Sequence, residues 1–349
     1  MTDRMRILLV HERFPPDYAG GGEYVVLETA RALQNAGHQV QVLTAGNPVL
    51  TSFAGIATQR LPMSRYRFNG AWRQVLEAAQ DVDLIHCFSY HAAWPAWLAG
   101  QKLGKPVVLG VLALFGDTWL EMRGALLGRL FRALERRQLS LPMAARIYLS
   151  GESLALARTL KLEQATDVII APGISLADYH ATPDKPYVMY AGKLDVRKGI
   201  DIVIEVARSL PDVPFRLIGW GERYDEIAAQ CPPNATLEPF QDRLHLASAL
   251  SGARLFLFPT KAETFGLIVA EAMASGCALV SSSALPFAGI RIAPSDSKAA
   301  CQAVRTLWDD PLRCAEAAAS NIAQAQAYSW EVHLTALCRL YRNVLGRPA

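Results

Sequence analysis

The pattern of apolar and polar positions predicts a first run of strands that alternate with helices. Arg6–Val10 is a short apolar segment typical of a strand, and apolar residues at helical spacing over Glu23–Ala36 predict a helix that ends at Gly37. Further strands are predicted at His38–Thr44, Asp83–Cys87, Pro106–Val111, Ala145–Ser150 and Val168–Ile170. Strands that alternate with helices favour a parallel sheet.

A second run of the same kind follows residues 178–186, a polar segment with two prolines that is typical of a linker between domains. Strands are predicted at Pro186–Ala191, Phe215–Gly219, Arg254–Phe258 and Ala278–Ser281, and helices at Gly199–Leu210 and Gly266–Ala274. We therefore expect an α/β chain of two Rossmann-like domains with parallel sheets, residues 1–178 and 179–328. Open α/β sheets bind ligands beyond the carboxyl ends of their strands, so two facing sheets would form an interdomain cleft.

Composition narrows the classes of function. The 349 residues suffice for two domains, and 51% hydrophobic residues exclude a disordered chain. The 35 Lys and Arg barely exceed the 32 Asp and Glu, which predicts no nucleic-acid partner. The six cysteines form no C-x-x-C pair, so neither a metal site nor a disulfide framework is predicted. The start of the chain lacks a secretory signal pattern, and no apolar stretch is long enough to span a bilayer, so we expect a cytoplasmic protein.

A glycine-rich segment lies between the first strand and the first helix. Gly20, Gly21 and Gly22 precede Glu23, and a backbone without side chains at the start of a helix can approach a phosphate closely. The alternative is a flexible loop. A dinucleotide site is less favoured because the G-x-G-x-x-G spacing is absent.

Two lysines lie on either side of a short loop in the second run. The predicted strand ends near Gly192, and Lys193 and Lys198 follow it. Two ammonium groups at this place would stabilise the negative charge that develops on a diphosphate leaving group. The alternative is that both lysines are simply solvated.

Two glutamates mark the segment from Pro259 to Gly276. Glu263 comes at the end of a predicted strand, and Glu271 lies inside the following helix. One carboxylate can reach a sugar and the other a ribose, whereas the residues that open the helix offer backbone donors to hydroxyls or phosphates. These residues are Thr264, Phe265, Gly266 and Leu267. Two glutamates at this spacing are, by themselves, common by chance.

Taken together, these segments resemble the retaining glycosyltransferases of the GT-B fold, in the large fourth sequence family that uses nucleotide-sugar donors. The resemblance covers nearly the whole chain. The matching segments are Gly21-Gly22-Glu23, Gly37-His38-Gln39-Val40, Asp83-Leu84-Ile85-His86, Gly192-Lys193 with Lys198-Gly199, Gly219-Trp220-Gly221, Glu263 to Glu271 with Ala272–Gly276, and Ser329-Trp330-Glu331 with Tyr341. We expect the last segment, residues 329–349, to form a helix that crosses back to the N-terminal domain.

The resemblance implies a donor site in the C-terminal domain and an acceptor site in the N-terminal domain. Its implied catalytic residues are Lys193 and Lys198 at the diphosphate and Glu263 at the sugar. The implied donor contacts are Gly21, Gly22, Gly192, Gly219, Thr264, Phe265, Gly266, Leu267 and, at the ribose, Glu271. Neither a cofactor nor a metal is implied, since a sugar linked to a nucleotide diphosphate, most often UDP or GDP, is the co-substrate. Family members retain the anomeric configuration through attack on the same face, in which the departing diphosphate helps to deprotonate the acceptor.

The chain departs from the family pattern on the acceptor side. Leu112 stands where the family has a histidine that faces the donor sugar, and Lys193 replaces an arginine. Either the donor needs no polar contact at its C6 position, as with a 6-deoxysugar or a pentose, or another side chain takes that role. The candidates on the acceptor side are Glu23, His86, His91 and Asp117. The two histidines are also of a kind that commonly lies in a core or a loop.

A basic amphipathic helix is predicted around residues 123–137. Its cations are Arg123, Arg129, Arg132, Arg136 and Arg137, and leucines and a phenylalanine lie between them. Such a helix can lie on the inner face of a membrane and reach a lipid-linked acceptor, or its apolar stripe can pack on its own domain. The acceptor is a glycan, a lipid-linked molecule or a small molecule. Two other functions stay open: a nucleotide-sugar epimerase or phosphorylase, and a catalytically silent binding partner.

Overall fold

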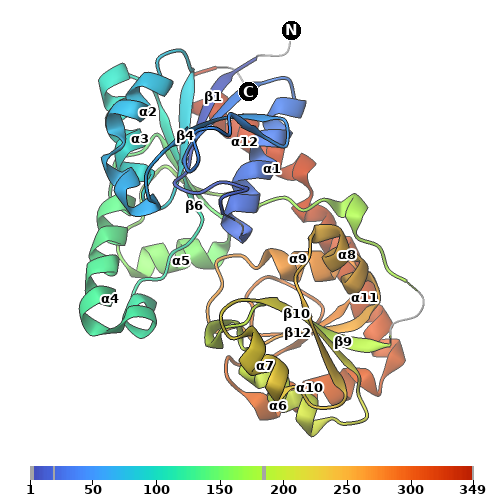
Figure 1. Ribbon diagram of the computed structural model, residues 1–349. Coiled ribbons are helices and arrows are strands. Elements are labelled where there is room, and N and C mark those ends of the chain that lie inside the picture. Colours follow the sequence, from blue (N-terminus) through green and yellow to red (C-terminus); the bar gives the residue numbers. More distant parts are fainter. Residues whose placement is uncertain (1–3, 19, 183–185, 348–349) are drawn as a thin grey trace. The chain divides into compact units, whose positions relative to one another are not determined.

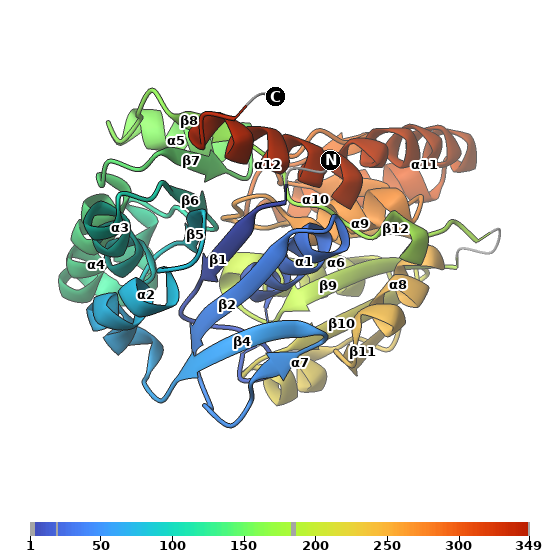
Figure 2. The same ribbon diagram turned by 90° about the horizontal axis from the view of Figure 1, so that it is seen from above.

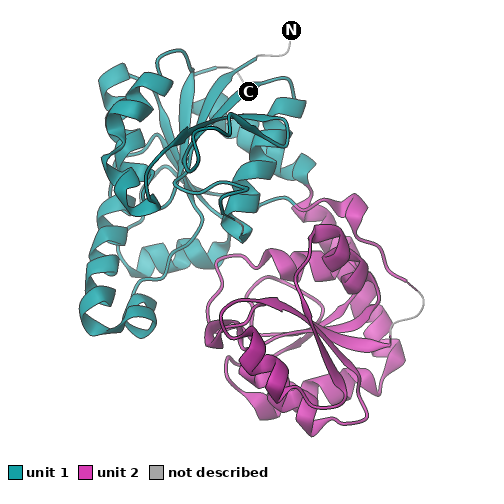
Figure 3. Cartoon of the chain, in the orientation of Figure 1, with its two compact units in different colours: residues 1–173, 330–349 teal, residues 174–329 magenta. Residues whose placement is uncertain are grey.

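The computed structural model describes residues 4–18, 20–182 and 186–347, so part of the predicted linker, residues 183–185, lies outside the described residues. The chain divides into two compact units (Figure 3). One comprises residues 1–173 together with 330–349, and the other comprises residues 174–329. The C-terminal segment therefore packs with the first unit.

The first unit is built on an eight-stranded sheet in the order β3-β4-β2-β1-β5-β6-β7-β8, and Figure 2 labels all of these strands except β3. All the neighbouring strands run parallel except β3, which is antiparallel to β4. The strands are β1 (Arg6–Val10), β2 (Gln39–Ala45), β3 (Ser52–Phe53), β4 (Ile56–Leu61), β5 (Leu84–Phe88), β6 (Val107–Val111), β7 (Ala145–Tyr148) and β8 (Asp167–Ile169). The central strands are apolar on both faces because helices cover both sides of the sheet.

Two apolar clusters join the helices of the first unit to the sheet. On one face, α1 (Gly21–Asn35) and α12 (Trp330–Val344) pack through buried residues such as Leu33 and Tyr341. On the other face lie α2 (Trp72–Ala78), α3 (Ala93–Leu103) and α5 (Gly151–Thr159), with the 3-10 turn Arg65–Gly70 (Figure 2). The strands are thus buried between two helical layers.

The second unit has a six-stranded, entirely parallel sheet in the order β11-β10-β9-β12-β13-β14. Its strands are β9 (Tyr187–Lys193), β10 (Phe215–Trp220), β11 (Ala235–Pro239), β12 (Ala253–Phe258), β13 (Ala278–Ser281) and β14 (Gly289–Arg291). Its helices are α6 (Ile200–Ser209), α7 (Tyr224–Gln230), α8 (Arg243–Ser251), α9 (Leu267–Ala274), α10 (Ser297–Trp308) and α11 (Pro311–Ala325), with 3-10 turns at Leu176–Asp178, Val196–Lys198 and Gln326–Tyr328. The α/β fold class with two parallel-sheet domains is confirmed.

The predicted basic helix differs from its expected form. It is part of α4 (Thr118–Leu139), and the helix is interrupted at Gly124, whose φ is 74° and ψ is 174°. This backbone conformation is open to glycine and strained for other residues. Arg123 therefore lies on a different arm of α4 from Arg129 and the later arginines.

A buried arginine ties the last two strands of the first sheet together. Arg146 of β7 is completely buried and pairs with Asp167 of β8, with Nε to Oδ1 at 2.6 Å and Nη2 to Oδ2 at 2.7 Å. The guanidinium also donates to the carbonyl oxygens of Leu139 and Leu162. The buried guanidinium is therefore paired with a carboxylate and hydrogen-bonded to two carbonyl oxygens. This pairing matters because an unpaired buried charge is very costly.

Removal of the carboxylate should leave this guanidinium uncompensated. We expect Asp167→Ala to lower the free energy of unfolding by about 3–5 kcal/mol. Asp212→Ala is the matched control, since Asp212 pairs with Arg305 at the surface and should matter much less. Urea unfolding of both variants checks this, and a loss at Asp167 no larger than that at Asp212 would contradict it.

Candidate functional site

The carboxyl ends of β9 and β12 bring two of the predicted segments together in the second unit. The two strands are parallel neighbours, so the loops that follow them leave the same edge of the sheet. The amide of Lys261 donates to the carbonyl oxygen of Arg197 at 2.8 Å, which joins the loops directly. Gly199 has a φ of 75°, and a Cβ atom there would lie 2.2 Å from the carbonyl oxygen of Pro259. Only glycine allows this approach.

The two loops place Lys198 against Glu263. The Lys198 ammonium donates to Glu263 Oε2, and both side chains are about one-fifth exposed. Glu263 Oε1 accepts from the amide of Thr264 at 3.3 Å, and Asp195 fixes the other loop by accepting from the amide of Lys198 at 3.0 Å. A lysine ammonium has three donors, so two remain for the oxygens of an anion.

The start of α9 lies directly beyond this pair. Gly266 precedes the helix with a φ of 86°, and a Cβ atom there would lie 3.2 Å from the Cγ atom of Glu263. Phe265 is buried and meets the ring of Tyr328 edge-on, with centroids 5.3 Å apart. Leu267 opens the helix, where the first amides have no carbonyl partner within the helix. The part of the predicted segment from Phe265 to Leu267 therefore offers amide donors next to a fixed ammonium.

Glu271 is paired with a cation that sequence reasoning missed. Its side chain is almost completely buried within α9, and its Oε1 contacts the guanidinium of Arg243 at the start of α8. Arg243 also donates to the hydroxyl of Tyr179 at 3.2 Å. The helix α8 was not predicted from the sequence, so no signal pointed to Arg243. A ribose at this carboxylate would have to share it with the guanidinium.

The other predicted donor residues lie at the same edge of the second sheet. Lys193 is the exposed last residue of β9, and Gly192 precedes it, close to the hydroxyl of Tyr190. Gly219 of β10 packs so closely on Leu194 that a Cβ atom would lie 2.4 Å from its Cδ2 atom. Gly219 therefore lets a side chain of the loop after β9 lie close to the sheet, and Gly192 leaves room for the Tyr190 ring within β9.

In the first unit, the glycine segment lies beside the residues that follow β1. Glu23 is buried, and its Oε1 lies 2.7 Å from the Nε of Arg13. A Cβ atom on Gly22 would lie 3.3 Å from Leu112 Cδ1. Gly21 is the first residue of α1. The apolar side chain of Leu112 therefore lies beside the glycine segment, at the position where the resemblance implies a histidine.

A buried carboxylate next to Arg13 was also missed. Glu12 is buried, and its Oε2 lies 3.3 Å from His11 Nδ1. Burial opposes ionisation and is the largest single influence, yet the charge and hydrogen bond of His11, the charge of His91 and a backbone hydrogen bond together outweigh it and lower the pKa of Glu12 to about 2. Burial also lowers the pKa of His91. The only sequence signal was the presence of polar residues at the carboxyl end of a predicted strand.

The predicted acceptor-side candidates lie in different surroundings. His91 is half-buried, and its Nδ1 lies 2.6 Å from the Nδ2 of Asn69. Asp117 is exposed and pairs with Arg132. His86 is completely buried in β5, and its Nδ1 lies 2.6 Å from the hydroxyl of Tyr341 in α12. His86 is therefore a core histidine, which corrects its place among the acceptor-side candidates.

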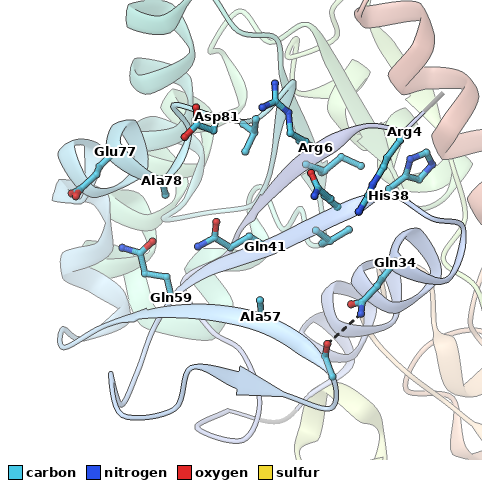
Figure 4. A pocket seen from close by; sticks show the side chains of 15 residues that line it. Arg4, Arg6, Gln34, His38, Gln41, Ala57, Gln59, Glu77, Ala78 and Asp81 are labelled. Atoms are coloured by element: carbon cyan, nitrogen blue, oxygen red, sulfur yellow. Dashed lines mark hydrogen bonds between the residues drawn. The ribbon is translucent and has the colours of Figure 1, made fainter.

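A hollow of about 830 Å³ lies elsewhere on the first unit. Figure 4 shows that its lining comes from the start of β1 and β2, including Arg6 and Gln41, and from Gln34 near the end of α1. Gln34 donates to the carbonyl oxygen of Gly55 at 3.4 Å. These are the amino ends of the strands, opposite to the edge where open α/β sheets bind their ligands. The hollow therefore lies outside the candidate site.

Comparison with known proteins relates each of the two units to glycosyl transferase domains. A model of the glycosyl transferase 4-like domain matches residues 20–173, and a model of glycosyl transferases group 1 matches residues 185–310. A phosphatidyl-myo-inositol mannosyltransferase of Mycolicibacterium smegmatis is 26% identical, over 95% of this chain and 92% of its own length. Among solved structures, sucrose-phosphate synthase from Thermosynechococcus elongatus has a TM-score of 0.85 and 20% identity, over 98% of this chain and 100% of that chain. Anabaena HepE in complex with UDP-glucose has a TM-score of 0.79 and 16% identity, over 96% and 99%.

The fold and the matched models define a GT-B glycosyltransferase. The chain belongs to the large fourth sequence family of these enzymes, as its motifs predicted. Across the residues that the structure describes, no helix combines the length and the apolar character needed to cross a membrane.

The buried histidine gives stability a defined pH dependence. Burial, with His333 nearby, lowers the pKa of His86 from 6.5 to about 3, so below pH 6.5 the unfolded chain takes up a proton that the folded chain does not. We expect the free energy of unfolding to fall between pH 7 and 5, with about 2 kcal/mol of that loss due to His86. The loss should shrink in His86→Phe but not vanish, because burial also lowers the pKa of His333.

Urea unfolding at pH 7, 6 and 5 measures this dependence. The comparison is between slopes, since His86→Phe also leaves the hydroxyl of Tyr341 without its partner and lowers stability at every pH. Equal slopes for the variant and the wild type would show that His86 is protonated in the folded protein.

Proposed function

We propose that the chain transfers a sugar from a nucleotide-diphosphate donor, UDP- or GDP-linked, to an acceptor hydroxyl with retention of the anomeric configuration. The single observation that carries this is the contact between Lys198 and Glu263 beside the start of α9. It sets a cation with free donors, a carboxylate and unpaired helix amides at one edge of a parallel sheet. This combination suits a diphosphate joined to a sugar.

Stabilisation of the leaving group is the main catalytic step in this proposal. The bond between the anomeric carbon and the diphosphate oxygen breaks, and the electron pair stays on the diphosphate. Lys198, with Lys193 at the end of β9, and the first amides of α9 compensate the growing charge. The acceptor oxygen bonds to the anomeric carbon on the same face, and its proton passes to the departing diphosphate.

In this proposal, Glu263 binds the sugar of the donor and Glu271 binds its ribose. Glu263 accepts from sugar hydroxyls while it holds the ammonium of Lys198, so the sugar and the leaving group are placed by one pair. Glu271 accepts from the ribose hydroxyls, and its contact with the guanidinium of Arg243 fixes the position of its carboxylate. The glycines Gly21 and Gly22 contribute the backbone approach to the phosphates from the first unit.

The first unit supplies the acceptor side. Its candidates are Glu23, His91 and Asp117, to which the structure adds His11 and Glu12. Leu112 offers no polar contact beside Gly22, which favours a donor without a hydroxyl at C6. The similarity to a phosphatidyl-myo-inositol mannosyltransferase and to a protein bound to UDP-glucose supports a nucleotide-sugar donor and a glycoconjugate product.

Nucleotide binding should raise the thermal stability of the chain selectively. One of UDP, GDP, ADP and dTDP, at about a hundred times its dissociation constant, should stabilise the folded state by about 2.7 kcal/mol. We expect this gain to be lost in Glu271→Gln and kept in Glu226→Gln, a matched change at an exposed ion pair on α7. Melting curves measure both. If no nucleotide shifts the curve, the donor site is wrongly assigned, and binding without turnover would instead favour a silent partner.

The loss of the proposed leaving-group cation should lower turnover. We expect Lys198→Met to reduce kcat by about 10²–10³-fold, because one preorganised charge on the leaving group is lost. Lys261→Met is the matched control, since Lys261 is an exposed lysine of the neighbouring loop. Release of nucleotide diphosphate, followed with and without acceptor, measures kcat and separates transfer from epimerase or phosphorylase activity. Equal kcat values for the two variants would exclude Lys198 from the reaction.

A further inference from the structure

The helix α4 forms an elbow whose tip stands out from the first unit. Its two arms meet at Gly124 and fold back on each other, as Figure 1 shows at the lower end of α4. A Cβ atom on Gly128 would lie 2.6 Å from the carbonyl oxygen of Trp119, so a bare glycine lets the arms touch. Trp119 stacks on Phe131 with centroids 5.1 Å apart. The elbow is therefore a packed feature of the fold.

Three leucines at the tip of the elbow lie in solvent. Leu126 is 83% exposed, Leu127 is 53% exposed and Leu130 is 64% exposed. The apolar stripe packs on its own domain farther along the same arm, where Leu134 is half-buried and Leu139 is completely buried. The alternative that the whole stripe packs inward therefore holds for the end of α4 but not for the tip.

The charges around these leucines are mainly positive. Arg123, Arg129, Arg136 and Arg137 are exposed. Asp117 neutralises Arg132, and Glu121 is an exposed acid on the first arm. Glu135 is buried and turned inward, where its oxygens accept from the amides of Phe115 and Gly116 and from Trp119 Nε1 at 2.8–3.0 Å. The acid in the middle of the second arm thus does not offset the surface arginines.

We propose that this elbow docks the first unit onto an anionic membrane surface. Leu126, Leu127 and Leu130 enter the boundary between headgroups and acyl chains, and the arginines bind lipid phosphates. A lipid surface presents apolar and anionic groups in one plane, and apolar burial combined with basic charge is what peripheral binding requires. A second copy of the chain is a poorer fit, because three side chains fall far short of the roughly 1,200 Å² of a stable interface.

Vesicle binding tests the proposal without donor or acceptor. The intact chain is sedimented with vesicles of phosphatidylcholine mixed with phosphatidylglycerol, and with vesicles of phosphatidylcholine alone. We expect binding to the anionic vesicles, weaker binding to the neutral ones, and a loss at high salt. The double variant Leu126→Ser/Leu127→Ser should bind at least about tenfold more weakly. Arg123→Gln/Arg129→Gln should lose about fivefold for each charge removed, on anionic vesicles only.

Two exposed leucines of the second unit provide the control. Leu244 is 71% exposed and Leu312 is 79% exposed, so Leu244→Ser/Leu312→Ser removes the same amount of apolar side chain elsewhere. This control should bind vesicles as the wild type does.

Three results would overturn the proposal. The first is equal binding of the tip variants, the control and the wild type, and the second is no binding to anionic vesicles at all. The third is a wild-type dimer in sedimentation velocity that Leu126→Ser/Leu127→Ser converts to a monomer, which would make the tip an interface between two copies. The thermal shift with nucleotide should be unchanged in the tip variants, so failure of this proposal is distinguishable from failure of the proposed transfer reaction.

Discussion

The close approach of two backbones, at Gly199 and Pro259, is the constraint on which the candidate donor site depends. Parallel pairing of β9 and β12 sets the two loops side by side, and the missing side chain of Gly199 lets them touch. Lys198 precedes that glycine and Glu263 follows that proline, so their contact spans two loops that are distant in sequence. Any residue larger than glycine at position 199 would push the two loops apart. It would thereby separate the ammonium of Lys198 from the carboxylate of Glu263.

The carboxylates proposed for ligand binding are already paired in the empty protein. Glu263 is held by Lys198, Glu271 by Arg243 and Glu23 by Arg13. Pairing offsets the cost of holding a charge away from water. A ligand hydroxyl therefore meets an acceptor whose position is already set by its partner. The same logic explains why the affinity for nucleotide should depend on these pairs and not on exposed ones.

The sequence predicted the layers of the fold better than its edges. Central strands such as β6 and β12 are continuous apolar runs, and their pattern alone marks them. The edge strands β11 and β14 were missed, because β11 is only partly buried and β14 has three residues. The break at Gly124 was missed as well, since the apolar spacing continues across it. Such spacing carries no information on the backbone angle φ of a single residue.

Some residues of the candidate site could likewise be predicted from the sequence and others could not. Lys198 and Glu263 came from motifs whose residues follow predicted strands, and topology then brings such residues together. Arg243 was beyond reach because its helix was not predicted, and the electrostatic influence of His91 on Glu12 acts between parts of the chain that are distant in sequence. A periodic pattern also cannot distinguish a histidine that faces a helix from one that faces a ligand. His86 lies on a strand buried between two layers, and its partner Tyr341 comes from the last helix of the chain. Its burial follows from the return of that helix to the first sheet, which no local segment encodes.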